Sequence, residues 1–69
     1  MFPNLDAEMA RYRVSQLTLA NAIGVTPTTM SLKLKGKAPI TLAESFKIRD
    51  AIDKNLKIEY LFETEEVNE

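Results

Sequence analysis

The sequence predicts an all-α protein, a compact bundle of five helices. Apolar residues recur at helical spacing, and no segment shows the strict alternation that is typical of a half-buried strand. The 2 glycines and 3 prolines stand where helices would begin or end. A chain of 69 residues without Cys or His has neither disulfides nor the usual zinc ligands to stabilise it, which favours efficient helix packing. We therefore expect one domain over residues 1–62, followed by an acidic, disordered tail over residues 63–69.

Capping residues delimit the first three expected helices. Pro3 suits the first turn of a helix, and Ser15 is a favourable N-cap for a second, short one. Gly24 closes that second helix, because glycine readily takes the left-handed conformation. Thr26 then caps a third helix, with Pro27 at its first position. We expect these helices over residues 3–12, 16–23 and 27–35.

Two more helices complete the expected bundle. Thr41 and Glu44 have the spacing of a capping box at the start of the fourth. Apolar residues cover more than half of its circumference, which predicts a central place in the core; they are Leu42, Ala43, Phe46, Ile48, Ala51 and Ile52. A short fifth helix is expected at residues 58–62. Helical spacing also assigns four apolar side chains to core packing: Met9, Met30, Leu34 and Phe46.

The charged residues are unevenly distributed along the chain. The formal net charge is −1, but residues 11–37 contain five basic residues and no acid, whereas residues 59–69 contain five glutamates. The electrostatic field that acts on phosphate groups depends on local clusters of charged residues rather than on the net charge of the chain. The basic middle segment is therefore compatible with nucleic-acid binding.

The composition excludes several classes of function. Without Cys or His, no nucleophile–base pair and no usual metal cluster can be assembled, so we expect no enzyme activity, no metal and no cofactor. No apolar run approaches the length of a membrane span, and the first residues lack both the basic start and the apolar stretch of a signal peptide. We therefore expect a cytoplasmic protein with no membrane partner.

Residues 15–37, SQLTLANAIGVTPTTMSLKLKGK, have the pattern of a helix-turn-helix, two short helices joined by three residues. The spacing of Gln16, Ala20, Gly24, Met30 and the pair Gly36-Lys37 resembles that of the phage-repressor and Cro-like (Xre-type) helix-turn-helix family. With the flanking helices, the resemblance covers about residues 2–62. It implies a lambda-repressor-like DNA-binding domain whose third helix lies in the major groove of double-stranded DNA while the second crosses the backbone.

This resemblance and helical geometry together assign roles to individual residues. If Met30 points into the core, an advance of about 100° per residue turns four side chains outward, where they would read bases: Thr28, Ser31, Leu32 and Lys35. Five residues are assigned to contacts with the DNA backbone. Gln16 and Lys37 take this role from their place in the family motif. The third helix supplies the other three, which are Pro27 at its amide end and Thr29 and Lys33 on its flank.

The sequence departs from the family pattern where bases would be read. Pro27, Thr28 and Leu32 stand where relatives often carry Arg, Gln or Ser, so bidentate readers are missing. Recognition by one protomer should be modest, and a homodimer on DNA or the shape of the DNA would have to supply the rest. We expect a small phage- or prophage-type repressor that acts by occluding its operator. The alternative is a protein-interaction or antitoxin-like module that docks a partner through Leu17 and Leu32.

Overall fold

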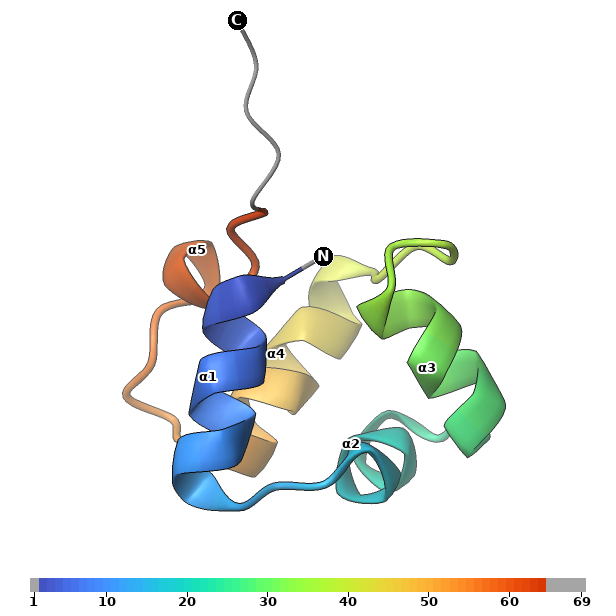
Figure 1. Cartoon of the computed structure of the whole chain (residues 1–69), viewed down its shortest axis with the longest axis horizontal. Coiled ribbons are helices and arrows are strands. Elements are labelled where there is room, and N and C mark those ends of the chain that lie inside the picture. The colour runs from blue at the N-terminus through green and yellow to red at the C-terminus, as the bar shows by residue number, and fades with distance from the viewer. Residues whose placement is uncertain (1, 65–69) are drawn as a thin grey trace, which may run out of the picture.

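The computed structural model describes residues 2–64 and confirms the all-α class. These residues form five helices, which Figure 1 shows as a small bundle. The helices are α1 (Pro3–Tyr12), α2 (Gln16–Ile23), α3 (Pro27–Leu34), α4 (Leu42–Ile52) and α5 (Ile58–Leu61). The first two have the expected bounds, and α3 and α5 each end one residue earlier than expected.

The predicted N-caps form in the structure. The Ser15 hydroxyl accepts the backbone N–H of Thr18 at 3.1 Å. The capping box of α4 is complete, because the Thr41 hydroxyl accepts the Glu44 N–H and the Glu44 carboxylate accepts the Thr41 N–H, both at 3.1 Å. These bonds satisfy amide groups that a helix start leaves without partners. The helix α1 ends at Tyr12 as expected, but its C-cap was not predicted: Arg13 takes the left-handed conformation with φ +57°.

Each helix contributes at least one side chain to a single core. The fully buried apolar residues are Leu5 from α1, Leu19 and Ala20 from α2, Met30 from α3, Ile48 from α4 and Leu61 from α5. The larger of these side chains each stabilise the fold by roughly 1.5–3 kcal/mol through burial. Met9 and Leu34 are half-buried against this cluster, so the core assignment is confirmed for them and for Met30.

The same prediction is wrong for Phe46, whose side chain is 42% exposed. Leu42 is 68% exposed and Ala43 is exposed as well, so α4 carries an outward apolar side in addition to its buried one. The buried side is centred on Ser45 and Ile48. The guanidinium of Arg49 lies 5.2 Å from the Phe46 ring centroid and covers part of the ring.

The short α5 is fastened to α1. The Tyr60 hydroxyl donates a 2.8 Å hydrogen bond to the carboxylate of Glu8, which is only 5% exposed and also pairs with Arg11 at 3.1 Å. This hydrogen bond raises the pKa of the Tyr60 hydroxyl. Asn4 donates to the Tyr60 carbonyl at 2.9 Å and to the Glu63 carboxylate at 3.3 Å. Disorder is predicted for residues 63–69, but Glu63 is tied to α1 by this hydrogen bond. Residues 65–69 lie outside the described range.

The arrangement leaves α3 at one side of the molecule. The backbone of α2 lies next to those of α3 and α4, and α1 lies next to α4 and α5. Among the described helices, α3 has only α2 as a close backbone neighbour, and Figure 1 shows it apart from α1 and α5. No helix in the described part of the chain combines the length and apolar character needed to cross a membrane.

Candidate nucleic-acid interface

The turn between α2 and α3 is built from local hydrogen bonds. Gly24 has φ +78°, and its N–H bonds to the Ala20 carbonyl at 2.9 Å. The Val25 N–H bonds to the same carbonyl at 3.0 Å, which closes α2. The Thr26 hydroxyl then accepts the Thr29 N–H at 3.2 Å and starts α3. The chain changes direction within these three residues, so α2 and α3 are two distinct helices joined by a tight turn.

Gln16 joins the starting ends of these two helices. It is half-buried, and its side-chain amide donates a 3.0 Å hydrogen bond to the Pro27 carbonyl in the first turn of α3. A primary amide carries two N–H groups. One of them therefore fixes α2 against α3, and the second can still donate to an outside acceptor such as a phosphate oxygen. This tie within the chain was not anticipated from the sequence.

The outward side of α3 carries the residues that geometry assigned to it. Met30 is fully buried, which sets the direction of the helix face as expected. Thr28 and Lys35 are exposed, Leu32 is 41% exposed, and Ser31 is half-buried. These four side chains lie on a helix that has a close backbone neighbour on one side only. The surface they form is accessible to a large partner.

Lys33 does not lie on this surface, although it was assigned to the DNA backbone. Its side chain is 8% exposed, and its ammonium group donates to the Pro39 carbonyl at 2.7 Å and to the Glu44 carboxylate at 3.0 Å. The hydrogen bond from Lys33 is the main reason that the pKa of Glu44 lies below its usual range, and the Thr41 N–H adds to the effect. The sequence held a signal for this position. Lys33 lies about 60° from the Met30 direction on a helical projection, nearly as close as Leu34.

The other residues assigned to the DNA backbone have varied surroundings. Pro27 is exposed at the start of α3. Thr29 is half-buried, and its hydroxyl accepts a 3.1 Å hydrogen bond from the Thr26 hydroxyl. Lys37 is exposed just beyond Gly36, which has φ +79°. The Lys37 N–H bonds to the Leu32 carbonyl at 2.9 Å, so this lysine is held against the end of α3.

Ion pairing reduces the positive charge that the sequence places around the helix-turn-helix. The buried Glu8 neutralises Arg11, and Glu44 neutralises Lys33. Lys35 and Lys37 form no ion pair with any residue of the range 2–64. Arg13 forms no ion pair in this range either, but it follows α1, so the unpaired positive charge beside α3 comes from these two lysines.

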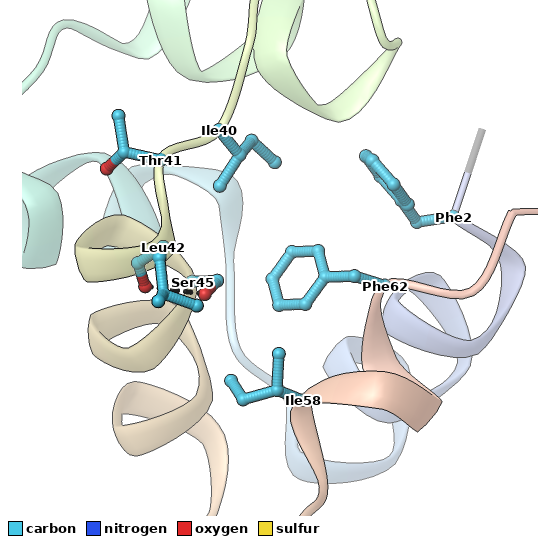
Figure 2. Close-up of a pocket in the computed structure, with 7 residues that line it drawn as sticks. All are labelled: Phe2, Ile40, Thr41, Leu42, Ser45, Ile58 and Phe62. Carbon is cyan, nitrogen blue, oxygen red and sulfur yellow. Dashed lines mark hydrogen bonds between the residues drawn. The ribbon is translucent and has the colours of Figure 1, made fainter.

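An apolar groove of about 400 Å³ lies between α4, α5 and the start of the chain (Figure 2). It is lined by Phe2, Ile40, Thr41, Leu42, Ser45, Ile58 and Phe62. Phe2 and Phe62 meet edge to face with their ring centroids 5.5 Å apart. The Ser45 hydroxyl donates to the Leu42 carbonyl at 2.6 Å. The lining includes no ionisable side chain, so it offers apolar contact rather than acid–base chemistry.

No group of three or more acidic, Cys or His side chains within residues 2–64 is placed to hold a metal ion. The candidate site is thus the surface of α3 with the adjoining helix starts and lysines. Comparisons of the chain with protein-family models, with curated proteins and with solved structures find no match.

Proposed function

We propose that this protein is a sequence-specific regulator that binds double-stranded DNA with α3 in the major groove. In this proposal it is a small cytoplasmic repressor with no catalytic role, and it acts by occluding its operator. The observation that carries the proposal is the exposure of one face of α3, a helix that joins α2 through a three-residue turn and has no other close helix neighbour in the described range. A helix presented in this way has the dimensions to enter a major groove about 12 Å wide.

Four features beside this face suit DNA phosphates. The starts of α2 and α3 are joined by the Gln16–Pro27 hydrogen bond, so the N–H groups of both first turns lie close together. Helix starts favour anions through these N–H groups and the helix dipole. The second N–H of Gln16 and the ammonium groups of Lys35 and Lys37 add further donors. Phosphate contacts of this kind position a protein on DNA without reading its sequence.

Two copies of the chain per operator are part of the proposal. The outward face of α3 presents Thr28, Ser31 and Leu32, none of which has the planar pair of donors or acceptors that reads one base with two hydrogen bonds. One protomer therefore discriminates weakly, and a homodimer on DNA doubles its contacts. A site selected from random DNA should contain two related half-sites about 10 base pairs apart, or a multiple of that distance.

A salt titration tests the proposal. Binding of the full chain to mixed-sequence duplex DNA should weaken steeply as salt rises, because each phosphate contact releases counterions. Lys37→Ala should reduce the slope of log affinity against log salt by about 1. Lys54→Ala is the matched control and should leave the slope unchanged. Lys54 belongs to the connection between α4 and α5, and Figure 1 shows this connection on the opposite side from α3.

A second candidate function is the docking of a protein partner, as in an antitoxin-like module. It is favoured by the exposure of Leu17 at 55% and of Leu32 at 41%, one on α2 and one on α3. Exposed leucines on neighbouring helices are typical of protein contacts. The titration separates the two candidates, because a chain that binds no DNA even at low salt contradicts DNA regulation and favours docking.

A further inference from the structure

We infer that α3 recognises the C5-methyl groups of thymine through the methyl group of Thr28 and the side chain of Leu32. This inference rests on the proposed function and specifies which DNA the α3 surface selects. Leu32 is 41% exposed on the outward side of a helix whose Met30 is fully buried. Thr28 is exposed one turn earlier on the same side. An exposed leucine in the middle of a DNA-facing helix needs an apolar partner, because contact with polar base edges would remove water from them without replacing their hydrogen bonds.

Few other groups on this face can identify a base. Ser31 is half-buried, and its hydroxyl can donate only one hydrogen bond. Lys35 is the one exposed side chain of α3 with a long, charged donor, and it stands at the closing end of the helix. Lys33 is occupied by Glu44 and Pro39. The thymine methyl group is the apolar feature among the bases in the major groove, so it matches the apolar centre of the α3 face.

The spacing of the two residues predicts the spacing of the bases. Thr28 and Leu32 are four residues apart, which is about 6 Å along a helix. Successive bases on one strand are about 3.4 Å apart along the DNA axis. Two contacted methyl groups should therefore lie about two base steps apart within each half-site.

The test compares thymine with uracil, which keeps the same hydrogen-bonding groups and lacks only the methyl. A site is selected from random DNA with the full 69-residue chain and then synthesised with thymine or with deoxyuridine at every thymine position. The ratio of the two affinities is the readout. Each methyl group lost from an apolar contact should weaken binding about fourfold. The loss of two in one half-site should weaken it roughly 15-fold, and the loss of all four in a site bound by two protomers roughly 200-fold.

Matched variants assign the effect to α3. Thr28→Ser removes a methyl group and keeps the hydroxyl, so the thymine-to-uracil ratio should fall about fourfold for each half-site, or roughly 15-fold for a site bound by two protomers. Thr28→Val keeps the methyl group and replaces the hydroxyl with a second methyl, so the thymine-to-uracil ratio should not fall. Leu32→Ala should also lower the ratio. Lys37→Ala should weaken binding to both duplexes equally, because a phosphate contact is indifferent to the base.

The outcomes distinguish a failure of thymine-methyl recognition from a failure of the proposed DNA binding. Equal affinity of the unchanged protein for the two duplexes, a selected site without thymine, or a ratio that Leu32→Ala leaves unaltered would each overturn methyl recognition while DNA binding stands. Absence of any DNA binding at low salt would overturn the proposed function itself. Unfolding midpoints of the variants, expected to be unchanged at these exposed positions, show that each comparison concerns the surface and not the fold.

Discussion

Lys33 lies in α3 and Lys35 is the C-cap residue of this helix, and their ammonium groups have opposite surroundings. Lys33 is 8% exposed and bonded to Glu44 and Pro39, whereas Lys35 is exposed and has no ion pair within residues 2–64. The Lys33–Glu44 pair also links α3 to α4, which are not close backbone neighbours. One lysine thus holds the helix in position, and the other is available to a partner.

Substitution of each lysine by methionine should separate these roles. Lys33→Met should lower the free energy of unfolding by about 1–3 kcal/mol, because it leaves the Pro39 carbonyl and part of the Glu44 carboxylate without their donor. Lys35→Met should leave stability unchanged and reduce the salt slope of DNA binding by about 1. Urea unfolding and salt titration measure the two effects. A lower salt slope with full stability in Lys33→Met would show that Lys33 contacts phosphate after all.

The same ion pair predicts how stability depends on pH. Lys33 and the Thr41 N–H lower the pKa of Glu44 in the folded protein. The pKa of a glutamate in the unfolded chain is about 4.3. Above this pH the Glu44 carboxylate stabilises the fold fully, and the contribution is lost as the pH falls through the lower pKa of Glu44 in the folded protein. Wild type should unfold at a higher temperature than Glu44→Gln at pH 7, and the difference should shrink as the pH falls to about 3. A difference that stays constant over this range would contradict the assignment.

At the scale of the elements, the turn between α2 and α3 depends on the backbone conformation of Gly24. Its φ of +78° is unfavourable for residues with a side chain, but a Cβ added there would meet no other atom within 4 Å. The cost of substitution is therefore conformational strain and not a steric clash. Gly24→Val should lower the free energy of unfolding by about 1–2 kcal/mol, and Gly24→Asn by less, because asparagine tolerates the left-handed region. Thermal unfolding measures both, and equal midpoints for the Val and Asn variants would argue against strain as the cause.

The elements also show what the sequence can predict. Helix starts were predicted well because a cap is local: Ser15, Thr26 and Thr41 each bond to an N–H three residues later. The orientation of α3 followed from Met30, a single apolar anchor at helical spacing. By contrast, Phe46 was misplaced, because its burial depends on which other helix lies beside it. Lys33 was placed on the outer flank, although its angle of about 60° from Met30 already indicated the buried side. The ties Gln16–Pro27 and Lys33–Glu44 join residues 11 positions apart, and no local pattern encodes such contacts.

At the scale of the whole molecule, the charge available for DNA is small and easily offset. Lys35 and Lys37 remain free of ion pairs with other described residues, while the sequence after Thr64 adds three glutamates, Glu65, Glu66 and Glu69. Charges on one chain affect its attraction to phosphate within about 10 Å at moderate salt, and farther in dilute buffer. The acidic end of the sequence should therefore reduce the non-specific affinity of the basic surface.

Removal of residues 65–69 tests this effect. The truncation changes the formal net charge from −1 to +2 and keeps Glu63, which accepts a hydrogen bond from Asn4. Affinity for mixed-sequence DNA should rise, most in dilute buffer, and the gain should shrink as salt is added. The unfolding midpoint should not change, because all six fully buried apolar residues precede the cut. A full-length chain with Glu65, Glu66 and Glu69 changed to Gln is the matched control, since it removes the same charge without shortening the chain, and it should bind as the truncated protein does. If only the truncation raises affinity, the effect comes from the segment itself and not from its charge; if neither does at low salt, the glutamates do not oppose DNA binding.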